Sequence, residues 1–254
     1  MALQIAVAGK GGTGKTTFAA LALEQLTVSG LKPVLAVDAD ANANLNEALG
    51  IEVEETIADI LAGLKNGTEP MPAGMTKEQY VEYKIYQSLA EGDDVDLLSM
   101  GGPEGPGCYC YANNILRKFM ESLSGNYVAV VADNEAGLEH LSRRTTQDVD
   151  FLFVISDASV RGLRSAKRVK QLVDTIKLKI KKIFLVVTKV QEGSLEALRS
   201  EVEATGMELI GTIPLDQAIF EYDLHGRPLV DLPDDTPAVI AVQQILSKAG
   251  IIRI

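Results

Sequence analysis

A glycine-rich stretch near the N-terminus has the residue types and the spacing that suit phosphate binding. Its sequence, GKGGTGKT from Gly9 to Thr16, fits the pattern G-x-x-x-x-G-K-[ST] between a predicted strand and a predicted helix. Glycines let backbone amides approach a phosphate closely, and the following helix adds its positive end. We expect Lys15 to reach the β- and γ-phosphates of a nucleotide and the Thr16 hydroxyl to bind Mg²⁺. The predicted nucleotide contacts of this loop are Gly9, Gly11, Gly12, Thr13, Gly14, Lys15, Thr16 and Thr17.

Acidic side chains end two other apolar segments. Asp38 and Asp40 lie in VLAVDADANANL, and Asp133 closes VAVVAD. In an open α/β sheet, ligands bind outside the carboxyl ends of the strands. A carboxylate close to a Mg²⁺–phosphate centre stays ionised and can orient water. We therefore expect these aspartates near the loop, with Asp133 holding Mg²⁺ through water and Asp38 supporting the loop and the water shell of the metal.

The two cysteines of the chain, Cys108 and Cys110, are separated by one residue in GPGCYCYANN. A disulfide across so short a span would close a strained ring, and one pair of thiolates is half of the tetrahedral set that zinc prefers. A two-fold dimer would supply the other half, because an isologous interface presents the same patch from both chains. The alternative is a pair of small buried cysteines in a turn, a common environment for free cysteine.

Short apolar runs without polar alternation predict the fold. Such runs are typical of parallel strands that helices cover on both faces. They occur at residues 4–9, 33–38, 95–100, 127–133, 151–156 and 183–188, with helix-like segments between them, among them 16–30 and 194–206. The alternation of strand-like runs and helix-like segments along the chain predicts an α/β fold with a doubly wound, mostly parallel sheet flanked by helices. We expect residues 1–254 to form a single domain, with residues 52–94 as a partly helical excursion beside the sheet.

The net charge of −11 argues against some partners. An acidic surface repels nucleic acid overall, and the basic run at residues 161–170 has the spacing of a solvated helix face. The longest apolar runs, of about six or seven residues, are far shorter than the ~20 residues that span a bilayer. No secretory signal is visible in the first residues. We expect a cytoplasmic protein that binds neither nucleic acid nor membrane.

The loop also carries a second lysine, Lys10, in KGGTGKT. This form resembles the deviant loop of the dimeric ATPases that include MinD, ParA and the nitrogenase iron protein. The resemblance implies a nucleotide-controlled homodimer in which Lys10 crosses the interface to the nucleotide of the partner. It also implies that Asp40, in the D-x-D of switch I, positions the attacking water and helps hold hydrated Mg²⁺. In the D-x-x-x-G pattern that begins at Asp133, the amide of Gly137 would sense the γ-phosphate.

The same resemblance bears on the choice of nucleotide. Members of the family contact the base from an Asn after the sixth strand, where this chain has Thr188 followed by Lys189. They also contact it from a loop near a later Ile-Pro, where this chain has Pro214 and Asp216. Thr188 is a departure, because Thr has no carboxamide to pair with both edges of an amine-bearing base. The sequence lacks the guanine-specific pattern N-K-x-D, so ATP and its product ADP are the predicted nucleotides.

The Cys-x-Cys pair, the deviant loop and EAGLEHLSR at residues 135–143 together resemble the CooC/AcsF nickel-insertion ATPases. Those proteins mature carbon monoxide dehydrogenase or acetyl-CoA synthase, and their paired thiols bind zinc or nickel at a dimer interface. The resemblance implies that Cys108 and Cys110 bind Ni²⁺ or Zn²⁺ in a metal- and nucleotide-dependent homodimer that serves a client nickel enzyme. We assign no chemistry to Glu139 and His140.

Two other functions are alternatives. A positioning ATPase like MinD or ParA would need a membrane-binding tail or a basic DNA surface, and the last residues, VIAVQQILSKAGIIRI, carry few basic side chains. A reductase like the nitrogenase iron protein would hold a [4Fe–4S] cluster in a dimer through two well-separated cysteines per chain. The cysteines here are separated by a single residue, which favours the nickel-insertion hypothesis.

Overall fold

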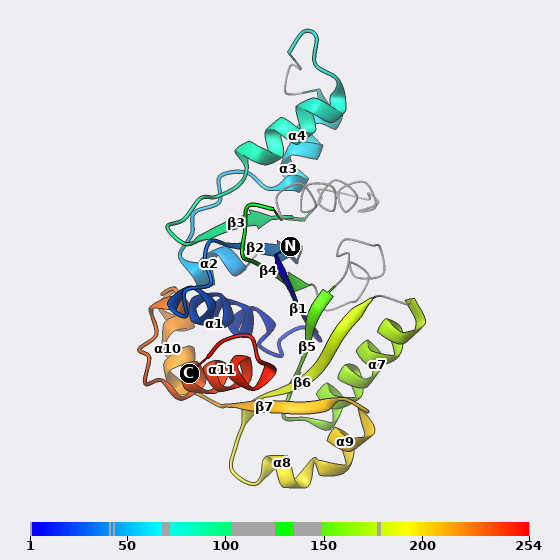
Figure 1. The fold of residues 1–254 in the computed structure, drawn as a ribbon, viewed down its shortest axis with the longest axis vertical. Coiled ribbons are helices and arrows are strands. Elements are labelled where there is room, and N and C mark those ends of the chain that lie inside the picture. Colours follow the sequence, from blue (N-terminus) through cyan, green and yellow to red (C-terminus); the bar gives the residue numbers. More distant parts are fainter. Residues whose placement is uncertain are drawn as a thin grey trace.

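The computed structural model describes residues 2–40, 42, 44–67, 72–102, 125–134, 149–176 and 179–253. These residues form one sheet of seven parallel strands in the order β3-β2-β4-β1-β5-β6-β7 (Figure 1). The strands are β1 (Leu3–Gly9), β2 (Val34–Ala39), β3 (Val95–Ser99), β4 (Ala129–Asn134), β5 (Val149–Asp157), β6 (Ile180–Val190) and β7 (Glu208–Pro214). This topology confirms the predicted doubly wound α/β fold, because the chain builds the sheet outward from β1 in both directions.

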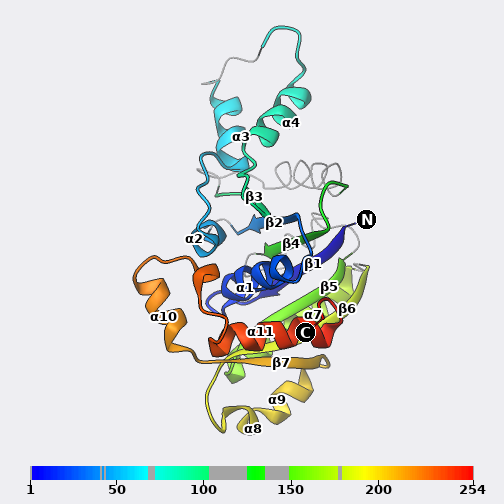
Figure 2. The same cartoon turned by 60° about the vertical axis from the view of Figure 1, so that its left-hand side comes forward.

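Helices cover both faces of the sheet. On one face α1 (Lys15–Val28) lies beside α11 (Pro237–Ala249) (Figure 2), and on the other lies α7 (Val160–Ile176) (Figure 1). The remaining helical elements are α2 (Leu45–Leu49), α3 (Ile57–Asn66), α4 (Lys77–Gln87), α8 (Ser194–Ala197), α9 (Arg199–Ala204), α10 (Gln217–Leu224) and the 3-10 helix η1 (Leu229–Asp231). Within the described ranges, no helix has the length and apolar character needed to cross a membrane.

The apolar runs pack on both faces, as a covered parallel sheet requires. In β1, Ile5 and Val7 pack into the cluster beneath α1 and α11, whereas Ala6 and Ala8 pack into the cluster beneath α7. Successive side chains of a strand point to opposite faces. One run without polar residues therefore contributes to both cores, and this is why period-two alternation is missing from the sequence.

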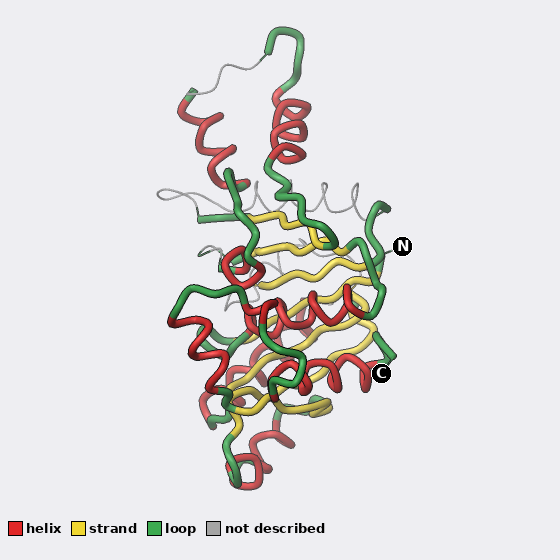
Figure 3. The backbone as a smooth tube through the Cα atoms, turned by 90° about the vertical axis from the view of Figure 1, so that its left-hand side faces the viewer, coloured by secondary structure: helices red, strands yellow, loops and turns green. Residues whose placement is uncertain are grey.

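The pair α3 and α4 extends beyond β3, the edge strand of the sheet (Figure 3). Each helix begins with a capping box, Thr56 with Asp59 in α3 and Thr76 with Gln79 in α4. These boxes satisfy backbone N–H groups of the first turn. Apolar residues of both helices pack with β2 in a third cluster that includes Leu35, Val37, Ile57, Ile60, Val81 and Ile85.

The helix-like segment predicted at residues 194–206 forms two short helices. The break falls at Leu198, between α8 and α9, where the backbone leaves helical geometry. Leu198 is buried in the cluster beneath α7. The segment is therefore helical over most of its length, as predicted, with one residue of non-helical backbone geometry between the two helices.

Phe153 of β5 lies in the core beneath α1. Its ring centroid is 5.1 Å from that of Phe18 and 5.9 Å from that of Phe184, and its side chain is fully buried. We predict that Phe153→Ala lowers the free energy of unfolding by about 3–5 kcal/mol, because it leaves a cavity in a packed core. Phe220→Ala in α10, where the ring is 59% exposed, is the matched control and should cost less than about 1 kcal/mol. Equal losses for the two variants in urea unfolding would contradict this packing.

Candidate functional site

The glycine-rich loop joins the carboxyl end of β1 to the start of α1. A Cβ atom on Gly9 would lie 2.2 Å from the carbonyl oxygen of Ile155 in β5, so a side chain does not fit there. Gly14 precedes α1 with a φ of 85°, a left-handed conformation that favours glycine. The Thr13 hydroxyl closes the loop by donating a hydrogen bond of 2.7 Å to the carbonyl oxygen of Lys10. The residues therefore form the strand, turn and helix that the motif requires.

The two lysines of the loop lie in different environments. Lys15, the first residue of α1, is buried, with 6% of its surface exposed. Thr16 and Thr17 follow in the first turn of the helix, whose N–H groups have no partner within the helix and attract an anion. The exposed residues of the loop are Lys10, Gly11 and Gly12. Lys10 is thus accessible to another chain, whereas Lys15 belongs to the interior of the site.

Asp133, near the end of β4, contacts α1 directly. Its Oδ2 atom accepts a hydrogen bond of 2.6 Å from the Thr16 hydroxyl, and its buried Oδ1 atom has no hydrogen-bond partner. Burial raises the pKa of Asp133 to about 7, although the Thr16 hydrogen bond opposes this shift. A carboxylate oxygen left unpartnered beside a hydroxyl offers the hard oxygen ligands that Mg²⁺ prefers. Thr16 and Asp133 therefore fit a Mg²⁺ ion.

The parallel register of β2 with β4 sets Asp38 opposite Asp133. The carboxylate of Asp38 accepts hydrogen bonds from the backbone N–H of Asp40 at 3.1 Å and of Leu45 at 2.9 Å. Burial raises the pKa of Asp38 to about 6, and these two hydrogen bonds oppose the shift. Asp38 thus ties the end of β2 to the start of α2, and it supports the loop that carries Asp40.

Asp40 lies in the same acidic cluster but contacts its own loop. Its Oδ1 atom accepts hydrogen bonds from the backbone N–H of Asn42 at 3.0 Å and from the Asn42 side-chain amide at 3.1 Å. Its charge lies close enough to raise the pKa values of Asp38 and Asp133. The structure therefore sets the three predicted aspartates near one another, with Asp133 in contact with α1 and Asp40 on the more exposed side, but the three carboxylates do not by themselves form a metal site.

Ser99 extends this row of polar strand ends, and the sequence analysis did not include it. It is the last residue of β3 and pairs with Asp38 in the parallel register. Its buried hydroxyl oxygen has no hydrogen-bond partner among the described atoms. A signal existed in the sequence, because Ser99 lies near the end of its apolar run, as Asp38 and Asp133 lie at the ends of theirs. The hydroxyl of a lone serine was too common a feature to single out.

Four other predicted nucleotide contacts lie at or just beyond the ends of β6 and β7. Thr188 and Lys189 of β6 donate hydrogen bonds to carbonyl oxygens of the glycine-rich loop. Pro214 is the last residue of β7, and Asp216 caps α10 by accepting a hydrogen bond of 3.0 Å from the backbone N–H of Ala218. The second carboxylate oxygen of Asp216 accepts from the backbone N–H of Ala238 in α11, also at 3.0 Å. In this structure Asp216 therefore joins two helices rather than pointing a free carboxylate at a ligand.

Several predicted site residues lie outside the described part of the chain. These residues are Cys108, Cys110 and Gly137, as well as Glu139 and His140, to which no chemistry was assigned. Within the described ranges, no three side chains of His, Cys, Asp or Glu gather as a metal site. The Cys-x-Cys metal site therefore stays a prediction.

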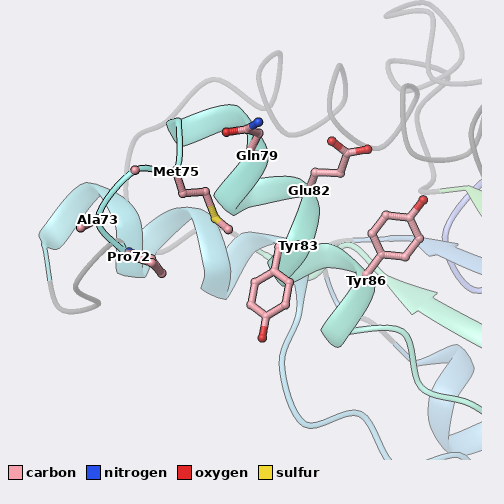
Figure 4. A pocket seen from close by; sticks show the side chains of 8 residues that line it. Pro72, Ala73, Met75, Gln79, Glu82, Tyr83 and Tyr86 are labelled. Atoms are coloured by element: carbon pink, nitrogen blue, oxygen red, sulfur yellow. The ribbon is translucent and has the colours of Figure 1, made fainter.

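A surface hollow of about 550 Å³ lies at the start of α4 and on its exposed side (Figure 4). The one charged residue in its lining is Glu82, and the lining contains no lysine or arginine. A phosphate would be repelled here, because it needs cations or aligned N–H groups. The lining residues are Pro72, Ala73, Gly74, Met75, Gln79, Glu82, Tyr83 and Tyr86. This hollow therefore does not suit the phosphates of a nucleotide.

A phosphate-binding loop between β1 and α1, with aspartates at the ends of β2 and β4, defines a P-loop nucleotide-binding fold. The chain belongs to the CobQ/CobB/MinD/ParA nucleotide binding domain family, whose model matches residues 5–229.

Relatives of known sequence or structure agree with this assignment. The chain is 48% identical to an uncharacterized ATP-binding protein of Methanocaldococcus jannaschii over 246 residues, which cover 96% of this chain and 97% of the relative. It is 29% identical to the carbon monoxide dehydrogenase accessory protein CooC of Rhodospirillum rubrum over 248 residues, which cover 91% of this chain and 90% of CooC. The fold is similar to that of the septum site-determining protein MinD of Pyrococcus horikoshii complexed with Mg-ADP. That match has a TM-score of 0.70 and 22% identity, and it covers 98% of this chain and 96% of the other.

The raised pKa of Asp133 makes stability depend on pH. A carboxyl whose pKa is higher in the folded protein binds more protons there than in the unfolded chain, so stability falls as the pH rises through this window. Between pH 4.5 and 7.5, we predict that the free energy of unfolding of the ligand-free wild type falls by about 2–4 kcal/mol more than that of Asp133→Asn, because each pKa unit corresponds to about 1.4 kcal/mol. The exposed Asp235→Asn is the control. Parallel stability curves for wild type and Asp133→Asn in urea unfolding would contradict the prediction.

Proposed function

We propose that the protein is an ATP-hydrolysing metallochaperone that delivers nickel to a nickel–iron–sulfur enzyme, either carbon monoxide dehydrogenase or acetyl-CoA synthase. The observation that carries the ATPase part is the contact between Thr16 and Asp133, which leaves one buried carboxylate oxygen unpartnered beside the loop. The nickel part is supported by the spacing of Cys108 and Cys110 and by the relationship to CooC.

The residues of the loop and of the acidic cluster have different roles in binding and hydrolysing ATP. Lys15 and the first turn of α1 would bind the β- and γ-phosphates, and Thr16 and Asp133 would hold Mg²⁺. Bound Mg²⁺ supplies positive charge that offsets the charge of the phosphates. Asp38 keeps the β2–α2 loop in place through its two backbone hydrogen bonds. Asp40, on the exposed side of the cluster, orients the water that attacks the γ-phosphate.

Lys10 couples the nucleotide to dimerisation in this proposal. It is exposed at the front of the loop and is available to a second chain. A lysine that reaches the phosphates bound by the partner adds a charge-assisted contact that exists in the closed dimer alone. ATP therefore favours the dimer by the difference in binding free energy between the two states. Hydrolysis removes this difference and lets the dimer open.

The cargo of the proposed dimer is a soft divalent cation. Two copies of Cys108 and Cys110 at a two-fold interface would supply four thiolates, which suit Ni²⁺ or Zn²⁺ and exclude the hard Mg²⁺ ion. Closure by ATP would complete the site, and opening would release the metal to the client enzyme. The site and the nucleotide thus act through the same interface.

The first prediction of this proposal concerns metal content. We expect the wild-type dimer to bind about one Ni²⁺ or Zn²⁺ ion per two chains, and Cys108→Ser with Cys110→Ser to bind less than about a tenth of that amount, because the alcohol is a poor ligand. Met75→Leu, which removes a sulfur atom elsewhere, is the control. Metal analysis of the size-separated dimer gives the result. Unchanged metal stoichiometry in the double variant would contradict the thiolate site.

The second prediction separates the two lysines of the loop. We expect Lys15→Ala to weaken ATP binding by at least about tenfold, because it removes a charge-assisted contact with phosphate. Lys10→Ala should bind ATP within about threefold of wild type but fail to dimerise with ATP. Lys32→Ala, which removes an exposed lysine paired with Asp94 at 3.0 Å, is the control. Calorimetry and light scattering measure the two properties, and normal ATP-driven dimerisation of Lys10→Ala would contradict the role of Lys10.

A positioning ATPase is the second candidate, because the fold is similar to that of MinD. One observation opposes a membrane role for the last helix. The apolar side chains of α11 are buried against the sheet and α1, among them Ala238, Val239, Val242, Ile245, Leu246 and Ala249. Co-sedimentation with anionic vesicles in the presence of ATP would favour the positioning function over metal delivery.

A further inference from the structure

The carboxyl end of β6 is irregular where it meets the glycine-rich loop. The parallel pairing with β7 runs from Val187 opposite Thr212 to Val190 opposite Pro214, so β6 carries one residue more than its partner across this interval. The irregularity contains Thr188 and Lys189. Bulges of this kind turn side chains in a new direction and are common beside active sites.

Lys189 has an unusual backbone conformation at this bulge. With a φ of 56°, it is the one non-glycine residue with a positive φ in the ranges that the structure describes. A left-handed conformation is unfavourable for a residue with a Cβ atom. Its ammonium group donates a hydrogen bond of 2.8 Å to the carbonyl oxygen of Gly12. The strained backbone thus accompanies a direct contact with the loop.

Thr188 makes a second contact with the loop. Its hydroxyl donates a hydrogen bond of 2.6 Å to the carbonyl oxygen of Thr13, and another acceptor, the carbonyl oxygen of Ser156, lies 3.2 Å away. The side chain is 4% exposed, and a Cβ atom on Gly14 would lie 3.8 Å from its hydroxyl oxygen. A hydroxyl has one proton to donate. Thr188 therefore donates its hydroxyl proton to an acceptor inside the protein, and it exposes almost no surface that could contact a nucleotide base.

These two contacts fix the orientation of two peptide groups. In a trans peptide, the carbonyl of one residue and the N–H of the next point in opposite directions. Holding the Gly12 carbonyl fixes the Thr13 N–H, which donates to the Lys10 carbonyl oxygen at 3.3 Å and closes the turn. Holding the Thr13 carbonyl directs the Gly14 N–H to the opposite side, ahead of α1. A carbonyl that rotated into this position would repel a phosphate.

We propose that Thr188 and Lys189 are positioning residues that hold the Gly12 and Thr13 carbonyls away from the phosphate, and that Thr188 does not read the base. This inference rests on the proposed nucleotide-binding function. The two side chains act on the triphosphate through the loop. Removing either side chain therefore lowers the affinity for every ligand that carries a triphosphate by the same factor. Selectivity for adenine then comes from other residues.

Thr188→Val tests the inference, because it keeps the shape of the side chain and removes the hydroxyl. We expect it to weaken binding of Mg²⁺ complexes of ATP, GTP and inorganic tripolyphosphate alike, each by about tenfold, since the Thr13 carbonyl loses a buried partner. Thr188→Ser should restore affinity to within about threefold. A changed ratio of ATP to GTP affinity with unchanged tripolyphosphate binding would show that Thr188 reads the base and would overturn the inference. Unchanged affinity for all three ligands would overturn it as well.

Lys189 is tested with a matched lysine of the same strand. Lys189→Met should lower the affinity for all three ligands by a common factor of about tenfold, and Lys189→Arg should lower it by less. Lys182→Met, which removes an exposed lysine over the Phe151 ring at the other end of β6, should leave all three affinities unchanged. A loss with Lys182→Met equal to that with Lys189→Met would overturn the specific role of Lys189.

Amide hydrogen exchange of the ligand-free protein separates this inference from the proposed function. We expect the amide of Thr13 to exchange at least about tenfold faster in Thr188→Val and Lys189→Met than in wild type, because its hydrogen bond to the Lys10 carbonyl opens more readily when the loop loses these contacts. Unchanged exchange would overturn the inference whether or not nucleotides bind. If wild type bound none of the three ligands while exchange was faster in both variants, the nucleotide-binding function would be contradicted. The role of Thr188 and Lys189 in holding the loop would still be supported.

Discussion

The hydrogen bond between Thr16 and Asp133 is the interaction on which the site depends. It joins the first turn of α1 to the end of β4, although the two residues are far apart in the sequence. The bond forms because β1 and β4 are neighbours in a parallel sheet, so both strands end at the same edge. The same parallel order sets Asp38 beside Asp133. One sheet edge thus receives the phosphate-binding loop and the acidic side chains together.

This edge is electrostatically costly without a ligand. Burial raises the pKa values of both Asp38 and Asp133, and one oxygen of Asp133 has no hydrogen-bond partner. A buried carboxylate that lacks a partner destabilises the folded chain, and a divalent cation with its water shell would relieve this cost. The interior of the sheet supplies the compensating stability, because its apolar runs pack on both faces. The acidic cluster thus lowers the stability of the folded chain, which agrees with its proposed role of holding Mg²⁺.

The sequence predicted the fold well because the signals were local. Apolar runs marked the strands, and the glycine spacing marked the loop before α1. The sequence did not signal that residues 194–206 divide into two helices at Leu198. It also could not foresee that Asp216 joins α10 to α11 or that Thr188 contacts the loop, because these hydrogen bonds join segments that only the folded chain brings together.

Calorimetric titration with ATP, in Mg²⁺ and in excess EDTA, tests most directly whether this edge is a Mg²⁺–nucleotide site. For wild type, we predict at least about tenfold tighter binding with Mg²⁺ than with EDTA, because Thr16 and Asp133 would hold the cation beside the phosphates. For Asp133→Asn, the difference should fall to less than about threefold. Equal affinity of wild type for ATP in Mg²⁺ and in EDTA would contradict the account.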